Sequence, residues 1–232
     1  MPAAEFADLL ARFTPERLCK RMFERNAARI AVKKPPVAVR NLLRIVEAML
    51  KLSNRKGFHA TSLRDLAEAA GLSMGGMYAY IGSKDALLVM ILEEVETAAT
   101  ELLSLAPEHV RADPRLHLRW IIEGHIRLTE VMQPWFAFVY MEAKAFPQKA
   151  RHAAMASELR TESEIAAVLE AGKAEGLFRI EDVRLTAALI KPLLQDWYVK
   201  RAKYRRGGVS VEAYVAQLDL FLTRALSVRE TG

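Results

Sequence analysis

The sequence predicts an all-α protein with two domains behind a helical N-terminal extension. Apolar residues recur at the three- and four-residue spacing of amphipathic helices, and no segment sustains the alternation typical of a strand. Prolines and glycines fall between these periodic stretches, where they end helices. The chain has 232 residues, 52% of them hydrophobic, which is enough for a sizeable core. We divide it into an extension at 1–36, a first domain at 37–95 and a larger domain at 96–232.

The extension is predicted to contain two helices, at 5–13 and 15–34, and Pro35-Pro36 ends the second. Residues 1–58 hold 13 Lys and Arg against 5 Asp and Glu, whereas the whole chain carries a net charge of +6. Such an excess of cations suits contact with phosphates. Two interpretations remain for the cations of the extension. They form an arm that contacts DNA, or they line the polar side of a helix that packs on the rest of the protein. They are Lys20, Arg21, Arg25, Arg29, Lys33 and Lys34.

The first domain opens with an amphipathic helix at 37–56, closed by Gly57. Two short helical patterns follow, and Gly71 between them suits the left-handed residue that ends a helix. Thr61 or Ser62 caps the first, and Ser73 caps the second, which is expected at 74–80. This arrangement indicates a helix-turn-helix whose second helix is the recognition helix. A long helix at 84–105 follows and leads into the larger domain.

The spacing of residues in this region matches a family pattern. The matching residues are Thr61-Ser62, Arg64-Asp65, Leu66-Ala67, Ala70-Gly71, Ser73, Gly75, Tyr78, Ser83-Lys84 and Leu87. Over residues 38–95 the chain resembles the DNA-binding domain of TetR-family repressors. The resemblance implies a homodimeric regulator that binds a palindromic, double-stranded operator, with one recognition helix for each half-site.

The resemblance and the docking geometry of the motif together predict the DNA contacts. We expect them at Thr61, Ser62, Ser73, Met74, Gly75, Gly76, Tyr78, Ala79, Tyr80 and Lys84. Tyr78 and Lys84 match family positions that commonly contact the DNA backbone, while Ser73 and Tyr80 carry the hydrogen bonds to bases. Where the family often has a lysine, a threonine and a histidine, this chain has Met74, Gly76 and Ala79. Few side chains are therefore expected to form hydrogen bonds to bases. Met77 and Ile81 are expected in the core.

The larger domain is predicted to contain helices at 114–132, 134–146, 149–175, 182–206 and 210–228, and the last two resemble the dimerising pair of the family. No HExxH, EF-hand or nucleophile-elbow spacing occurs in this part of the sequence. The chain has one cysteine, Cys19, which we interpret as a partly buried thiol. We therefore expect no enzymatic activity, no metal site and no cofactor.

Aromatic and flexible apolar residues with a few polar anchors are typical of a small-molecule cavity. The candidates are Trp120, Gly124, His125, Trp135, Phe138, Val139, Glu142, Met155, Asp196 and Trp197, and an ordinary aromatic core is the alternative. Residues 135–146 and 195–206 are similar to segments of TetR-type regulators of lipid and acyl-CoA catabolism, which implies a fatty acid or acyl-CoA effector. A phosphate site for such an effector, or simply cations at a helix C-terminus, accounts for Lys200, Arg201, Lys203, Arg205 and Arg206.

The prediction is thus a repressor that leaves its operator when a small apolar effector binds the larger domain. Two alternatives remain: a DNA-binding protein that needs no ligand, and a carrier or enzyme with an incidental helix-turn-helix. Residues 1–12 lack the cationic start of a secretion signal, and no apolar run is long enough to span a bilayer. We therefore expect a cytoplasmic protein without a membrane partner.

Overall fold

The computed structural model describes residues 3–227, with side chains from Phe6 onward. Helices occupy most of this range, with an isolated β-bridge between Phe178 and Ser227, so the all-α fold is confirmed. Internal contacts divide the chain into two compact units. The N-terminal unit comprises residues 3–98 and 131–155, and the C-terminal unit comprises 99–130 and 156–227. Segment 131–155, which the sequence-based boundary assigned to the larger domain, therefore groups with the N-terminal residues.

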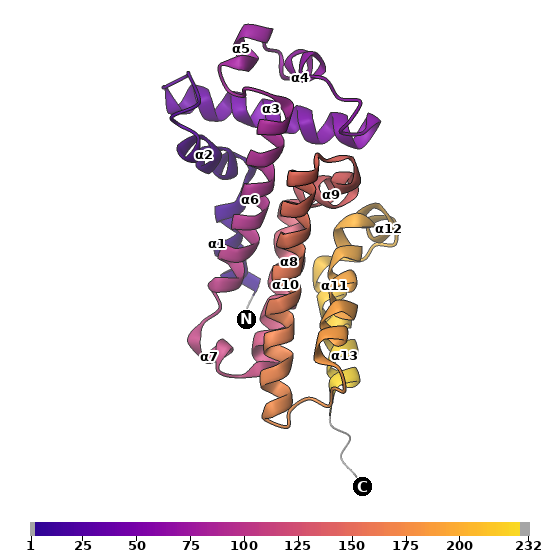
Figure 1. Ribbon diagram of the computed structural model, residues 1–232. Helices are drawn as coiled ribbons and strands as arrows, with labels where there is room; N and C mark the ends of the chain where they lie inside the picture. Colours follow the sequence, from indigo (N-terminus) through magenta and orange to yellow (C-terminus); the bar gives the residue numbers. More distant parts are fainter. Residues whose placement is uncertain (1–2, 228–232) are drawn as a thin grey trace. The chain divides into compact units, whose positions relative to one another are not determined.

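The N-terminal unit is built around α3, which supports the two short helices of the helix-turn-helix (Figure 1). The side chains of Leu42, Ile45 and Met49 on α3 are fully buried, as are Leu66 and Met77 on the two short helices. Their common core fixes both short helices on one support. The elements are α1 (Ala3–Leu10), the 3-10 turn η1 (Ala11–Phe13), α2 (Pro15–Arg25), α3 (Pro35–Lys56), α4 (Leu63–Ala70), α5 (Met74–Tyr78), most of α6 (Lys84–Ser104), α9 (Gln133–Glu142), the 3-10 turn η2 (Ala143–Ala145) and the start of α10.

Helix α2 ends at Arg25, so the predicted helix at 15–34 is wrong in its second half. The cause is Asn26, whose side-chain amide donates to the carbonyl oxygen of Met22 at 2.8 Å and ends the helix. The chain then turns back, and the Ala31 N–H donates to the carbonyl oxygen of Ala79 at 2.8 Å. Helix α3 begins at Pro35 rather than at 37, because a proline fits the first helical positions, where its missing N–H is not needed.

Helix α2 packs on the body of the N-terminal unit. Arg21 and Arg25 both form ion pairs with Glu94 on α6, and the side chain of Glu94 is fully buried. Arg21 Nη2 lies 2.5 Å from Glu94 Oε1. For these two cations the structure favours the packed helix over the DNA-contacting arm. Cys19 on the same helix is fully buried, and burial raises the pKa of its thiol to about 12, which makes it inert.

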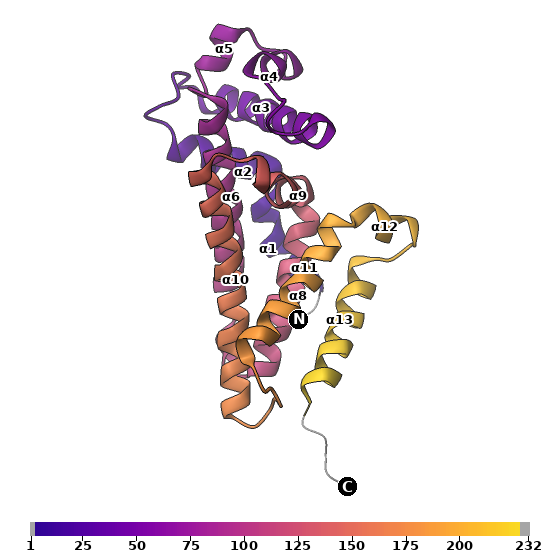
Figure 2. The same cartoon turned by 45° about the vertical axis from the view of Figure 1, so that its right-hand side comes forward.

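The C-terminal unit contains α7 (Glu108–Arg111), α8 (Pro114–Val131), most of α10 (Gln148–Ala174), α11 (Val183–Val199), α12 (Arg201–Arg206) and α13 (Val211–Leu226). The short helix α7 was not predicted, and the expected helix at 182–206 is two helices that meet at Lys200. Figure 2 shows the chain leading along α11 to α12 and returning along α13. The Tyr214 hydroxyl donates to the Leu193 carbonyl oxygen at 2.6 Å and holds α13 to α11.

Residue 228, the predicted end of the last helix, lies outside the described residues, as do Met1 and Pro2. Among the helices of residues 3–227, none combines the length and the apolar character that crossing a bilayer requires.

Candidate functional site

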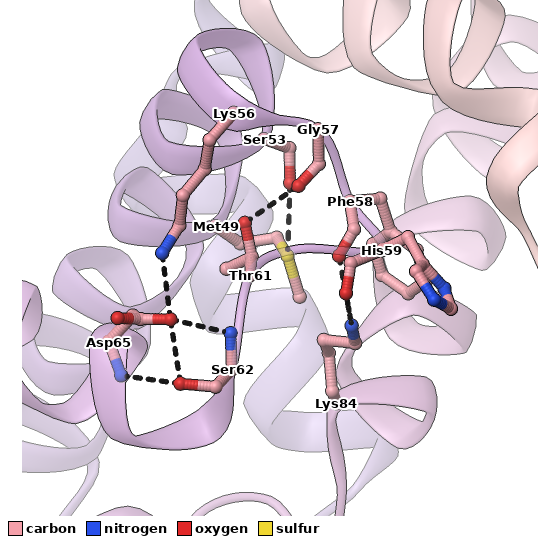
Figure 3. Close-up of polar contacts among 10 residues, drawn as sticks. All are labelled: Met49, Ser53, Lys56, Gly57, Phe58, His59, Thr61, Ser62, Asp65 and Lys84. Atoms are coloured by element: carbon pink, nitrogen blue, oxygen red, sulfur yellow. Dashed lines mark hydrogen bonds and ion pairs between the residues drawn. The ribbon is translucent and has the colours of Figure 1, made fainter.

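Helix α4 begins with a reciprocal cap that the local sequence supplies (Figure 3). The Asp65 N–H donates to Ser62 Oγ at 3.1 Å, and the Ser62 N–H donates to Asp65 Oδ2 at 2.7 Å. Lys56 at the end of α3 pairs with the same carboxylate oxygen at 2.8 Å. The hydrogen bonds from Lys56 and then from Ser62 hold the pKa of Asp65 well below its usual range. Gly71 ends the helix at φ 62°, the left-handed conformation that the sequence predicted.

Helix α5, the predicted recognition helix, is a single short turn from Met74 to Tyr78. The Gly76 N–H donates to Ser73 Oγ at 3.0 Å, which caps the helix as expected. Met77 is fully buried and fixes α5 on the unit, whereas the next residue, Tyr78, is 55% exposed. The helix therefore has one anchored face and one face that is open to solvent.

Two of the predicted DNA contacts are buried. Thr61 is fully buried, and its hydroxyl donates to the Gly57 carbonyl oxygen at 2.9 Å (Figure 3). Tyr80 is 5% exposed, and its hydroxyl accepts a hydrogen bond from Asn41 Nδ2 at 2.7 Å. Both side chains face the interior of the N-terminal unit and cannot reach DNA in this structure. We therefore correct the expectation for both residues: they position the helix-turn-helix.

Lys84, the first residue of α6, is half-buried beside the segment that joins α3 to α4. Its ammonium donates to the carbonyl oxygens of Phe58 at 2.9 Å and His59 at 3.3 Å (Figure 3). It also lies 4.3 Å from the centroid of the Phe58 ring, at the distance of a cation–π contact. Burial lowers its pKa. Lys84 thus holds this segment, and it uses two of its three donors to do so.

The remaining predicted contacts lie at the surface. Ser62, Ser73, Gly75 and Tyr78 are exposed, and Met74, Gly76 and Ala79 are half-buried. Two exposed arginines near them were not predicted as contacts. Arg64 lies in the first turn of α4, and Arg44 on α3 approaches the Gly71 carbonyl oxygen at 3.5 Å. Arg64 belongs to the matching residue series and was detectable, whereas Arg44 is 27 residues from Gly71 and only the fold brings them together.

The predicted effector residues fall in both units. Trp135, Phe138, Val139, Glu142 and Met155 belong to the N-terminal unit, and Trp120, Gly124, His125, Asp196 and Trp197 to the C-terminal unit. The structure brings Trp135, Phe138 and Glu142 together in a cavity of about 600 Å³ within the N-terminal unit. Val139 is absent from the cavity lining, and Met155 is 53% exposed.

The C-terminal unit buries several polar side chains among its helices. His125 on α8 and Lys191 and Gln195 on α11 are 3%, 5% and 6% exposed. Gln195 Nε2 donates to Glu158 Oε1 on α10 at 2.6 Å. Burial, opposed by Glu158 and Glu162, lowers the pKa of Lys191 to about 8. Burial and the nearby Lys191 lower the pKa of His125 well below its ordinary value.

Lys191 was not predicted as a site residue, because a single lysine in an apolar helix is ordinarily expected to extend into solvent. The indication of burial was its position between two apolar residues, Ile190 and Leu194, both of which are buried. A buried cation of this kind, with a displaced pKa, marks a candidate binding site.

Asp196 and Trp197 serve the junction of α11, α12 and α13. Trp197 is fully buried, and its Nε1 donates to Glu130 Oε2 at 3.1 Å. Asp196 pairs with Lys200 at 2.5 Å and accepts a hydrogen bond from Tyr204. These contacts hold the junction of the three helices, and a contact of Asp196 or Trp197 with a ligand stays a prediction. Two cations of the cluster at 200–206 are likewise engaged, because Arg201 makes two hydrogen bonds to Glu130 at 2.7 and 2.8 Å and Lys200 pairs with Asp196.

Comparison with known proteins agrees with this geometry. Residues 45–91 match the family described as bacterial regulatory proteins, tetR family, and residues 111–201 match the tetracyclin repressor-like C-terminal domain. The crystal structure of PfmR, a TetR family transcriptional regulator from Thermus thermophilus, is 32% identical. That match covers 77% of this chain and 97% of PfmR, with a TM-score of 0.62. The MbdR regulator from Azoarcus sp. CIB is 22% identical, with 81% and 100% covered and a TM-score of 0.65.

Among curated proteins, the HTH-type transcriptional regulator BetI of Paraburkholderia xenovorans is 29% identical over 123 residues. BetI of Burkholderia ambifaria is 32% identical over 114 residues. The alignments cover 50% and 45% of this chain, and 63% and 57% of those relatives. The chain thus spans less than two thirds of the length of the curated relatives that it matches.

Proposed function

This chain belongs to the TetR family of bacterial regulatory proteins, and from that premise we propose that it is a DNA-binding transcriptional regulator that acts as a homodimer. The observation that carries the proposal is the outward face of α5. Met77 anchors the helix in the core, while Ser73, Gly75 and Tyr78 are exposed. In a helix-turn-helix, the first residues of the second helix reach base edges in the major groove.

Gly75 supports contact with a partner on this face. A glycine inside a helix destabilises it by about 0.5–1 kcal/mol relative to alanine, and a reason is therefore needed. A Cβ atom at Gly75 would meet no heavy atom within 4 Å, so packing inside the protein does not require the glycine. Close approach of a DNA groove would explain it.

The surrounding residues suit phosphate contact. Ser62 and Arg64 are exposed at the start of α4, and Lys84 retains one N–H donor beyond the two that hold the Phe58 segment. We keep Ser62, Ser73, Met74, Gly75, Gly76, Tyr78, Ala79 and Lys84 as proposed contacts, and we add Arg64.

Exposed apolar side chains support the homodimer. Leu185 and Leu189 on α11 are 57% and 64% exposed, and Phe221 on α13 is 54% exposed. Such side chains on two neighbouring helices are typical of an interface that a second copy covers. Leu218, Leu222 and Leu226 on α13 are buried within the unit and serve its own core.

We further propose that the protein is a repressor and that a fatty acid or acyl-CoA compound releases it from DNA. The support is chemical: such compounds join an apolar chain to an anionic group, and the C-terminal unit buries the cation of Lys191 beside His125 and Gln195. Glu158 and Glu162 already favour the charged form of Lys191, so the anionic group of the effector would have to replace one of these carboxylates beside it.

Selection from a pool of random DNA duplexes tests the proposal, since it requires no known operator. The purified chain is expected to enrich a palindrome with half-sites about one helical turn apart, roughly 34 Å. Arg64→Gln should weaken binding to the selected site and lower the slope of log K against log salt by about one. Arg115→Gln, an exposed arginine in the C-terminal unit, is the matched control. Enrichment of no sequence above background would refute the proposal.

A further inference from the structure

The cavity of about 600 Å³ lies between α3 and α9, within the N-terminal unit, and we call it the α3–α9 groove. Its size matches that of small-molecule sites, which commonly measure about 300–1,000 Å³. Val46 and Leu50 on α3 and Trp135 and Phe138 on α9 are buried side chains that line it. The groove therefore offers an apolar, partly aromatic surface that belongs to the support of the helix-turn-helix.

The charges at the groove favour a cation. Three charged side chains line it: Glu47 and Lys51 on α3, and Glu142 at the end of α9. The two carboxylates outnumber the ammonium, so an anion would meet net repulsion and a cation net attraction. Trp135 and Phe138 add aromatic faces, which attract cations through the ring quadrupole.

Glu142 also connects the groove to the helix-turn-helix. Its Oε2 accepts the N–H of Phe58 at 2.6 Å, and Lys84 donates to the carbonyl oxygen of Phe58 at 2.9 Å. The Phe58 ring packs against Phe138 and Phe146, with centroids 6.2 and 5.2 Å away. A ligand that engages Glu142 therefore competes for the carboxylate that holds the segment leading to α4.

We propose that the α3–α9 groove binds a small cation with an aromatic or apolar body, and that its occupancy loosens the Phe58 segment. This site is separate from the anionic effector site that we propose in the C-terminal unit. Binding of the cation to this groove does not require DNA. A failed test of this site would therefore leave the proposed function intact, and a failed test of the proposed function would leave this site intact.

Isothermal titration with benzyltrimethylammonium tests the site, and phenylacetate, an anion with a similar ring, serves as the comparison ligand. The cation should bind at least ten times more tightly than phenylacetate. Glu47→Gln with Glu142→Gln should weaken cation binding at least tenfold, and a glutamine at 142 can still accept the Phe58 N–H. Glu68→Gln, an exposed carboxylate on α4 outside the groove, should bind as the wild type does. Equal binding of the two ligands, or wild-type affinity in the double variant, would overturn the proposal.

A second measurement locates the ligand and remains decisive if the double variant fails to fold. With 13C-methyl methionine, the resonance of Met141, which lines the groove and is identified by Met141→Leu, should shift on saturation with the cation. Exchange of the Phe58 amide hydrogen with solvent should accelerate at the same time. An unmoved Met141 resonance would exclude the groove as the site, and unchanged exchange at Phe58 would overturn the coupling.

Discussion

The helix-turn-helix and the interior of the C-terminal unit satisfy their polar groups in different ways. Ser62 and Ser73 cap their helices with partners three residues along the chain. In the C-terminal unit Gln195 bonds Glu158 across 37 residues, and Lys191 affects the pKa of His125 on another helix. The helix caps of the first region are thus specified locally, whereas these polar groups of the second region meet only in the complete fold. This difference suits a rigid DNA-binding element and a core whose polar groups can respond to a ligand.

The largest expected effect comes from the exception to this contrast, the long-range ion cluster in the N-terminal unit. Arg21 and Arg25 meet the buried Glu94 from 73 and 69 positions away in the sequence. Glu94→Gln should lower the free energy of unfolding by about 3 kcal/mol, because it leaves two arginines without their carboxylate partner. Urea unfolding measures the loss. Glu68→Gln, which changes an exposed carboxylate on α4, should change it by less than about 0.5 kcal/mol, and equal losses would contradict the account.

The next effect is a pH dependence that originates in the C-terminal unit. The pKa of His125 in the folded protein lies well below its ordinary value, so below about pH 6.5 the unfolded chain binds a proton that the folded chain does not. His125 should therefore lower the free energy of unfolding by about 1.4 kcal/mol for each pH unit below 6.5, until the pKa of the folded state is reached, and His117, whose pKa burial also lowers, adds to the slope. Lys191, with a pKa of about 8, contributes only at higher pH.

Urea unfolding at several pH values between 7.5 and 5 measures this slope. His125→Gln should reduce it, whereas His152→Gln, which removes an exposed histidine, should leave it unchanged. A slope that survives His125→Gln would assign the pH dependence to other groups.

A smaller effect tests the local caps directly. Ser62→Ala removes the hydroxyl that accepts from the Asp65 N–H, and it should lower the free energy of unfolding by about 1 kcal/mol. Ser163→Ala in the middle of α10 removes an exposed hydroxyl that caps nothing, and it should change stability by less than about 0.5 kcal/mol. Thermal and urea unfolding of both variants gives the comparison, and similar losses would remove the cap from the explanation.

The smallest expected effect concerns Tyr80. Tyr80→Phe deletes the hydroxyl that accepts from Asn41 and should lower the free energy of unfolding by about 0.5–1 kcal/mol, the net value of one hydrogen bond. Because the ring is buried, the preference for each base of the selected DNA site should stay the same. A relaxed preference at one base pair would instead show that Tyr80 contacts a base.

The sequence was sufficient for the parts of the fold that depend on neighbouring residues. The caps at Ser62 and Ser73 and the left-handed Gly71 follow from residue chemistry over three or four positions. The end of α2 at Arg25 was missed although its cause is equally local, because Asn26 lies inside an apolar periodic pattern and bonds the carbonyl oxygen of Met22 only four residues before it. The pattern also could not separate α11 from α12, since no proline or glycine lies at Lys200.

The candidate site shows the same limit. Exposure of Tyr78 and burial of Met77 follow from helical periodicity, whereas Thr61 and Tyr80 turn inward because of partners at Gly57 and Asn41. The partners of Lys191 and Glu142 lie on distant elements, so no spacing in the sequence pointed to them. Residue type alone could nominate these side chains but could not say where they point.

The affinity for the selected DNA duplex during titration with palmitoyl-CoA tests the central proposal, that a ligand of the C-terminal unit controls the DNA-binding element. We expect the wild type to lose between about fivefold and 150-fold in affinity, the range of typical coupling energies. Lys191→Met should bind the duplex as tightly as the wild type and lose at most twofold, while Lys173→Met, an exposed cation of the same unit, should respond as the wild type does. An undiminished affinity of the wild type, or equal losses in wild type and Lys191→Met, would contradict the account.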